Sequence, residues 1–435
     1  MSLFVFLNLS FCVITFLAFA AIFLRYRYLF VKPSILVLAF FHLSIQWAAA
    51  FQAPAIELFL PRPYPFFVLA QVFPLLGLVG SFFILHRRAA IVSQRCAGSV
   101  MDLDVHPYQI VLLFFAVLGI AGLYLMTVPL SQTGLAAIFI RPEESHQARE
   151  LSLKLLDNAL VRYAFSFLKT VFTPLLVVLA TVWLLQNLRR LRVAAAIFCA
   201  VCLGVSFVAV VLPGARLPGA LLFFTIIWAL LLRYKIKIKP LYFFPAVLLV
   251  VGLPVVLTVM REGQDLNLLA FLDYLKGGIF ERIFVIPMEV GLWHVHYAQT
   301  SGFVGVAAIP KLAVLFGETP LYVPNLIFQK YTLYELESGS AVTSFVFSYY
   351  CYFGMVSFLF SLLALWSLDL TLLLFHRFRN NAMLLAALAA LHTSSIAFVS
   401  TDFTTVLITN GFLLILVVGV LLDRYAPATF SKEKM

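Results

Sequence analysis

The chain has 435 residues, of which 63% are hydrophobic and only 11% are charged, and its mean hydropathy is +1.04. A soluble domain is about half apolar, so this composition excludes an ordinary soluble protein and indicates an integral membrane protein. The formal net charge of +11 does not indicate a nucleic-acid partner, because most basic residues form short clusters at the ends of apolar stretches, as membrane topology requires.

Apolar stretches long enough to span a bilayer recur along the whole chain. A spanning helix needs about 20 mainly apolar residues. The sequence therefore predicts an all-α polytopic membrane protein, with 1–435 forming a single membrane domain. We expect about eleven transmembrane helices, at 3–24, 34–53, 66–85, 109–129, 163–186, 193–212, 217–232, 241–260, 341–368, 381–400 and 404–422.

The orientation of these spans follows from the basic clusters. The first stretch has no basic segment before it and no small-residue cleavage site, so we expect a retained span and not a signal peptide. By the positive-inside rule, the alternate basic connections face the cytoplasm, which places the N-terminus outside and the C-terminus inside. The clusters are Arg25/Arg27/Lys32, Arg87/Arg88/Arg95, Arg189/Arg190/Arg192, Arg233/Lys235/Lys237/Lys239, Arg377/Arg379 and Arg424/Lys432/Lys434.

Two segments on the outer side are longer than any cytoplasmic connection. The outer loop 130–162 contains a polar stretch with regularly placed leucines, which predicts a helix lying on the bilayer surface. A larger segment, 261–340, is expected to carry short helices and the active site. Because most acidic residues also lie outside, we expect the chemistry to be extracytoplasmic.

The cations of the outer surface indicate an anionic ligand. Arg216 opens a predicted span, Arg261 follows another, and Arg282 begins the polar stretch 281–299. Arginine binds phosphate oxygens bidentately and keeps its charge when it is partly desolvated. These three residues suit a lipid diphosphate in the plane of the membrane surface, although headgroup contacts or ion pairs would explain them as well.

The stretch ERIFVIPMEVGLWHVHYAQ (281–299) carries the candidate acid–base residues. Arg282, Glu289 and His296 are spaced by seven and would share one stripe of a helix, about 21 Å long from end to end. Pro287 and Gly291 are expected to interrupt that helix. His294, His296 or Glu289 can serve as a general base, or the histidines can make structural hydrogen bonds.

A metal centre is not predicted. An H-x-H pair binds metal on a strand, where both side chains share a face, but no third ligand stands near His294 and His296. We expect no cofactor.

Four motifs between about 210 and 360 resemble a known family. They are LPGARLPGALLFF (212–224) with a G-x-R signature, the arginine-led stretch 281–299, the proline-bounded AAIPKLAVLFGETPLYVPN (307–325), and SGSAVTSFVFSYYCYFGMVSF (338–358). Their order is similar to that of the bacterial oligosaccharide repeat-unit polymerases of the Wzy type, the O-antigen polymerases. Two positions depart from the family pattern: Lys311 replaces an arginine, and Ser348 replaces an acidic residue before the tyrosines.

The resemblance implies a metal-independent glycosyltransferase of the bacterial inner membrane. Its partners would be undecaprenyl-diphosphate-linked oligosaccharides and membrane lipids, with a flippase and a chain-length regulator nearby. A sugar hydroxyl of the acceptor would attack the donor on the periplasmic face, for O-antigen, common antigen or exopolysaccharide. The implied site residues are Arg216, Arg261, Arg282 and Lys311 at the diphosphate, His294, His296 or Glu289 as catalytic base, and Trp293, Tyr322 and Tyr349 at the sugars.

Three alternatives stay open, one of them a structural scaffold without activity. An O-antigen ligase uses the same donor lipid but transfers the glycan to the lipid A core. A transporter of lipid-linked oligosaccharide would place ionisable residues along a transmembrane path. Few such residues lie inside the predicted spans; Lys169 is near an outer end and Asp369 near an inner end.

Overall fold

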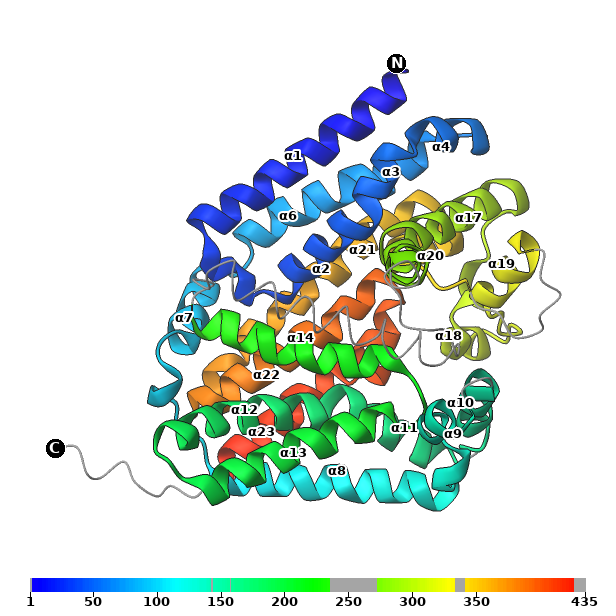
Figure 1. Cartoon of the computed structure of the whole chain (residues 1–435). Coiled ribbons are helices and arrows are strands. Elements are labelled where there is room, and N and C mark those ends of the chain that lie inside the picture. The colour runs from blue at the N-terminus through cyan, green and yellow to red at the C-terminus, as the bar shows by residue number, and fades with distance from the viewer. Residues whose placement is uncertain (1, 142–143, 157, 235–271, 333–340, 426–435) are drawn as a thin grey trace. The chain divides into compact units, whose positions relative to one another are not determined.

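A computed structural model describes residues 2–141, 144–156, 158–234, 272–332 and 341–425 (Figure 1). Every regular element in these ranges is helical. The predicted span 241–260, Arg261, and part of the segment 261–340 lie outside the described residues.

Contacts divide the chain into two compact units. Unit 1 comprises Met1–His86, Phe280–Leu370 and Ser395–Val406, and unit 2 comprises Arg87–Ile279, Thr371–Ser394 and Leu407–Met435. The α-helices mainly in unit 1 are α1 (Leu3–Arg25), α2 (Pro33–Phe41), α3 (Trp47–Phe51), α4 (Ala53–Phe59), α5 (Tyr64–Phe67), α6 (Phe73–Phe83), α17 (Ile286–Ser301), α18 (Pro310–Leu315), α19 (Val323–Tyr331), α20 (Phe345–Phe353) and α21 (Ser357–Ser367). Those mainly in unit 2 are α7 (His86–Cys96), α8 (Pro107–Thr127), α9 (Gly134–Ile140), α10 (Ser145–Lys154), α11 (Ala159–Phe167), α12 (Thr173–Arg189), α13 (Val193–Val211), α14 (Arg216–Arg233), α22 (Asn381–Ile396) and α23 (Phe412–Arg424).

Nine helices of the described chain are long and apolar enough to cross a membrane, which is the pattern of a multi-pass membrane protein. They run over Leu3–Arg25, Pro33–Phe51, Tyr64–Phe83, Pro107–Thr127, Ala159–Arg189, Val193–Val211, Phe345–Arg377, Asn381–Val399 and Thr405–Arg424. Each coincides with a predicted span, and a tenth prediction corresponds to the shorter apolar helix Leu217–Arg233. The count of eleven stays a prediction.

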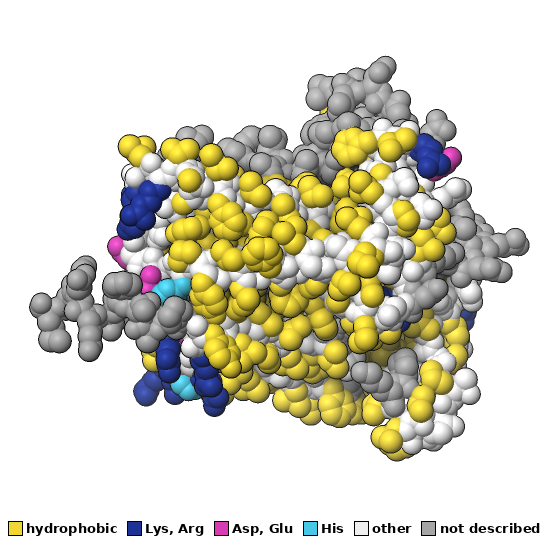
Figure 2. Space-filling model, turned by 90° about the horizontal axis from the view of Figure 1, so that it is seen from below, with side chains coloured by type: hydrophobic (Ala, Val, Ile, Leu, Met, Phe, Trp, Pro, Cys, Tyr) yellow, Lys and Arg dark blue, Asp and Glu magenta, His cyan; other side chains and the backbone are white. Residues whose placement is uncertain are grey.

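The surface of these helices is apolar. On α8 the exposed side chains include Phe115, Leu118 and Met126, the last 83% exposed. Figure 2 shows a broad hydrophobic face with lysine and arginine gathered near its edges. Such a face suits lipid, since water would leave a patch of this size unfavourably hydrated.

Local sequence explains where many of the helices begin. Proline stands in the first turn of α2 and α8, where its missing N–H would in any case have no intrahelical partner. Polar caps serve elsewhere: the hydroxyl of Thr133 accepts a hydrogen bond from the N–H of Ala136 at the start of α9. The segment 130–162, predicted as an outer loop, contains α9, α10 and the beginning of α11.

Two neighbouring spans of unit 1 contain π-helical segments, η2 (His42–Gln46) and η3 (Val68–Val72). Gln46 Nε2 donates to the carbonyl of Gln71 at 3.2 Å, and Gln71 Nε2 donates to the carbonyl of Gln46 at 3.0 Å. A π-turn disturbs the regular hydrogen-bond ladder, and here the two glutamines supply partners for the carbonyls concerned. The polar residues of these spans thereby hold two helices together.

A buried ion pair fixes two helix ends in unit 1. Lys32 Nζ lies 3.9 Å from Asp369 Oδ2, and neither side chain is exposed. Lys32 also donates to the carbonyls of Ser81 and Ile84 at the C-terminal end of α6. Asp369 accepts hydrogen bonds from the backbone N–H (3.1 Å) and hydroxyl (2.7 Å) of Ser34 in the first turn of α2. Lys32 therefore caps the C-terminal end of α6, and Asp369 caps the N-terminal end of α2.

Replacing Lys32 by methionine should destabilise the protein by about 3 kcal/mol, because it leaves the Asp369 carboxylate buried without its counter-charge. Thermal unfolding in detergent measures this effect. Lys276→Met is the matched control, since Lys276 is exposed and such surface changes usually stay within about 0.5 kcal/mol. Equal melting temperatures for both variants would contradict the assignment.

Candidate functional site

Residues 281–299, which carry the candidate acid–base residues, lie in a continuous helix that is π-helical at first and α-helical after it. A π-helical segment, η8 (Tyr274–Val285), leads directly into α17, and Pro287 stands in the first turn of α17. The expectation that Gly291 interrupts the helix is wrong. Gly291 lies inside α17 because the helix packs closely on α20: a Cβ there would lie 2.6 Å from the Phe347 ring.

The two histidines of α17 lie in different environments. His294 is fully buried, and its Nδ1 bonds to the carbonyl of Val290 at 2.8 Å, while its Nε2 finds no partner among the described residues. His296 is only partly buried. Residues two apart on a helix point about 200° apart, so the H-x-H spacing does not make a ligand pair here.

His296 belongs to an aromatic cluster formed by α17, α19 and α4, which we call the His296 cluster (Phe59, Trp293, His296, Lys330 and Tyr331). Its Nδ1 lies 2.5 Å from the hydroxyl of Tyr331, and its ring centroid lies 4.6 Å from that of Phe59. The Trp293 ring stacks on Tyr331, with centroids 5.7 Å apart and planes within 7°. Aromatic side chains around a few polar groups are a common lining of small-molecule sites.

Lys330 adds a positive charge to this cluster. Its Nζ donates to the hydroxyl of Ser301 at 2.7 Å and lies 4.8 Å from the ring centroid of Tyr297. Burial lowers the pKa of His296, and the charge of Lys330 lowers it further. Burial also raises the pKa of Tyr331 to about 12. At neutral pH the pair is therefore an uncharged imidazole beside an uncharged phenol.

The loop between α4 and α5 is attached to the same helix. Gln299 Nε2 donates to the carbonyl of Arg62 at 2.8 Å, and the N–H of Arg62 donates to Gln299 Oε1 at 3.2 Å. This pair of bonds fixes the backbone at Arg62 one turn beyond His296, and leaves its exposed side chain to solvent. Sequence reasoning did not select Arg62, Phe59, Lys330 or Tyr331.

The other candidates in unit 1 do not join the cluster. Arg282 is exposed on η8, fourteen residues and roughly 20 Å from His296 at the rise of an α-helix. Glu289 is half-buried in the first turn of α17, Tyr322 is 58% exposed before α19, and Tyr349 is on α20, with its ring 6.2 Å from that of Phe345. The backbone of Lys311 lies in α18, but its side chain is outside the described residues.

In unit 2, Arg216 is the first residue of α14, and the described atoms there are those of the backbone. The turn before it is packed tightly on the start of α9. The N–H of Leu135 donates to the carbonyl of Leu212 at 3.0 Å, and a Cβ on Gly134 would lie 2.2 Å from the carbonyl oxygen of Pro213. Gly214 has φ +80°, which a glycine adopts without strain. The G-x-R motif therefore follows a fixed backbone turn.

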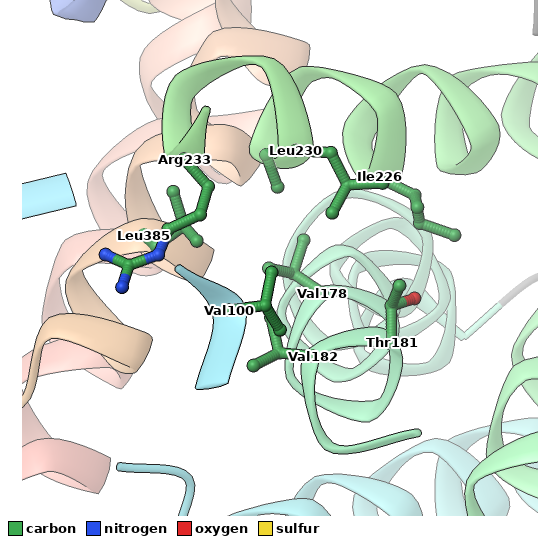
Figure 3. Close-up of a pocket in the computed structure, with 9 residues that line it drawn as sticks. Val100, Val178, Thr181, Val182, Ile226, Leu230, Arg233 and Leu385 are labelled. Carbon is green, nitrogen blue, oxygen red and sulfur yellow. The ribbon is translucent and has the colours of Figure 1, made fainter. Parts of the chain in front are cut away.

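A hollow in unit 2 is unsuited to a polar substrate. It is lined mainly by aliphatic side chains such as Val178, Ile226 and Leu385, together with Thr181 and Arg233. Figure 3 shows the guanidinium of Arg233 turned away from Ile226 and Thr181. Its Nη1 donates to the carbonyl of Cys96 at 2.8 Å and its Nε to that of Ser99 at 3.1 Å, so this arginine closes the end of α7.

No protein-family model, curated protein or solved structure matches the chain. Among the described residues, no three histidine, cysteine or acidic side chains are grouped so as to hold a metal ion.

His294 should make stability depend on pH. Burial lowers its pKa to about 4, against about 6.5 in an unfolded chain. The unfolded state therefore binds a proton first as the pH falls, so the stabilisation is complete above about pH 6.5 and declines towards pH 4, by about 3 kcal/mol in all. Melting in detergent at pH 7 and pH 5 should show this decline, and His294→Gln should show a smaller one. Equal slopes for the two proteins would contradict it.

Gly134→Ala should destabilise unit 2 by about 1–3 kcal/mol, because the new methyl group meets the backbone of Pro213. Gly119→Ala in α8 is the matched control. A Cβ there has nothing within 4 Å, and alanine is the better helix former by about 0.5–1 kcal/mol. Melting temperatures in detergent should move in opposite directions, and a shared direction would exclude the tight turn.

Proposed function

We propose that the protein is a membrane-embedded, metal-independent glycosyltransferase that lengthens glycans carried on undecaprenyl diphosphate. The observation that carries the proposal is the His296 cluster: a neutral imidazole among aromatic faces, with the Lys330 ammonium group nearby, on the helix that carries the arginine-led motif. The order of the four sequence motifs supports the same family of reactions. A polymerase of the Wzy type on the periplasmic face of a bacterial inner membrane combines these features.

In the proposed reaction, His296 is the general base. Its Nδ1–H donates to the Tyr331 oxygen, which leaves the lone pair of Nε2 free to take the proton of an acceptor hydroxyl. The hydroxyl oxygen forms a bond to the anomeric carbon of the donor. The bond from that carbon to the diphosphate oxygen breaks, and the leaving group takes the electron pair.

The developing negative charge on the diphosphate calls for cations at the leaving group. Arg216 and Arg282 have this role in the proposal, with Arg261 and Lys311 in support, and arginine offsets phosphate charge without a metal. Trp293 and Tyr331 provide faces for sugar rings, with Tyr322 and Tyr349 as further candidates. His294 is a weaker choice than His296, since burial lowers its pKa to about 4 and hides it from an acceptor.

The decisive experiment supplies purified protein with undecaprenyl-diphosphate-linked repeat units and follows glycan length by gel electrophoresis. Wild-type protein should lengthen the glycan in the presence of a chelator. His296→Gln should reduce the rate by about 100-fold or more, as expected for loss of a general base, and Tyr331→Phe should reduce it less. Arg216→Ala and Arg282→Ala should abolish long chains.

One control variant and a pH profile accompany the assay. Gln94→Ala, in α7 of unit 2, should leave the rate unchanged. Because His296 acts as a neutral base, the wild-type rate should fall as the pH decreases below about 6.5. Transfer only to added lipid A core would indicate a ligase, and no lengthening under any condition would exclude the polymerase.

A further inference from the structure

The segment 59–63, which we call the α4–α5 loop, borders the imidazole of His296. It runs from the last residue of α4 to the residue before α5. The Phe59 ring lies against the imidazole, with centroids 4.6 Å apart and planes inclined by 39°. A ring in this position limits what can approach His296, and the reaction described above gives it no role.

The imidazole has one nitrogen left for a substrate. Its Nδ1 lies 2.5 Å from the hydroxyl of Tyr331, and no hydrogen bond in the described part of the chain engages Nε2. His296 is only partly buried, and Phe59 is 42% exposed. Because a sugar ring is about as wide as the distance between the two centroids, a sugar bound at the imidazole also meets Phe59.

Different elements border His296 on its two sides. Trp293 and Gln299 lie three residues before and after it, which is about 60° to either side on an α-helix. Trp293 stacks on Tyr331 of α19, whereas Gln299 bonds to the α4–α5 loop. Figure 1 shows α17 between α4 and α19, in agreement with these contacts. The imidazole therefore has α19 on one side and the α4–α5 loop on the other.

Gln299 fixes the loop at a single residue. Its Nε2 donates to the carbonyl of Arg62 at 2.8 Å, and its Oε1 accepts from the N–H of the same residue at 3.2 Å. The end of α4 is closed separately, by a bond from the N–H of Leu60 to the carbonyl of Ile56. Since α4 does not need Gln299 to close its end, the two bonds serve the position of the loop against α17.

The sequence of the loop restricts its movement further. Residues 60–65 read LPRPYP, so proline fixes φ at about −65° at positions 61, 63 and 65. Proline has no N–H, and the N–H of Arg62 is the one that stands between Pro61 and Pro63. Gln299 bonds to that N–H and to the carbonyl of the same residue. Phe59, three residues before this anchor, is thereby held in place beside the imidazole.

We propose that the acceptor sugar binds against Phe59, and that Gln299 is a positioning residue which holds this ring beside His296. The apolar C–H face of a pyranose covers the exposed part of the phenyl ring, while one of its hydroxyls donates to Nε2 of His296. Phe59 thereby selects acceptors by the face that their terminal ring presents. This inference rests on the proposed function, since the ligand is the acceptor of that reaction.

The first measurement is the apparent KM for lipid-linked repeat units in the glycan assay. Phe59→Ala should raise KM roughly tenfold and change kcat less than about threefold, whereas Phe59→Tyr, which keeps the ring, should stay close to wild type. Gln299→Met has a similar length but cannot bond to Arg62, and it should raise KM as well. Leu58→Ala is the matched control, because Leu58 is the neighbouring residue on α4 and is 89% exposed.

The second measurement needs no substrate. Diethyl pyrocarbonate acylates accessible neutral imidazoles, and mass spectrometry of the purified full-length protein follows this reaction at His296. Phe59→Ala and Gln299→Met should both increase the rate at His296, while Leu58→Ala should not. His294, which is fully buried on the same helix, is the internal reference.

Three outcomes would overturn the inference: wild-type KM in Phe59→Ala, an equal rise of KM in Leu58→Ala, or unchanged reactivity of His296 in both loop variants. A wild-type protein that lengthens no glycan rejects the proposed function and the acceptor with it. Increased reactivity of His296 in the variants would then retain only the position of the loop. Glycan lengthening with unaltered KM and reactivity in the variants retains the proposed function and rejects this inference.

Discussion

A cation at the end of an apolar helix is largely dehydrated, so its N–H donors need hydrogen-bond acceptors from the protein or from a ligand. Lys32 and Arg233 find these acceptors in the protein, since each donates to carbonyls at the C-terminal end of a helix. Each helix end needs acceptors or donors for four backbone groups. One buried side chain therefore satisfies its own donors and the backbone at once, and the packing of both units depends on such contacts.

Lys169 differs from Lys32 in its surroundings. Its Nζ lies 5.1 Å from the ring centroid of Phe165, whereas Lys32 bonds to two carbonyls and faces the Asp369 carboxylate. Removing Lys32 should lower stability, because the Asp369 carboxylate would stay buried without its counter-charge. Two lysines at the ends of spans therefore have different surroundings in the same fold.

Hydropathy predicted nine of the long helices because a span leaves a run of apolar residues that needs no partner to be seen. No run of residues in the sequence predicts the π-helical segments. Gln46 and Gln71 bond to each other's backbone only after two helices have packed. The His296 cluster was half predicted for the same reason. Trp293 and His296 are near in sequence, but Tyr331 is thirty-five residues away, and no periodicity links it to them. Gly291 was misread because its small size serves contact with Phe347 and not a break.

The helix period also explains how neighbouring histidines acquire different chemistry. His294 and His296 have the same side chain, but a step of two residues turns one into the interior against α20 and the other towards α19. Full burial lowers the pKa of His294 to about 4, so it stays neutral but is a weak base at neutral pH. His296 keeps a partly exposed ring, and a phenol at Nδ1 can fix its tautomer. A general base needs access as well as a suitable pKa, and in this helix only His296 of the two has the access.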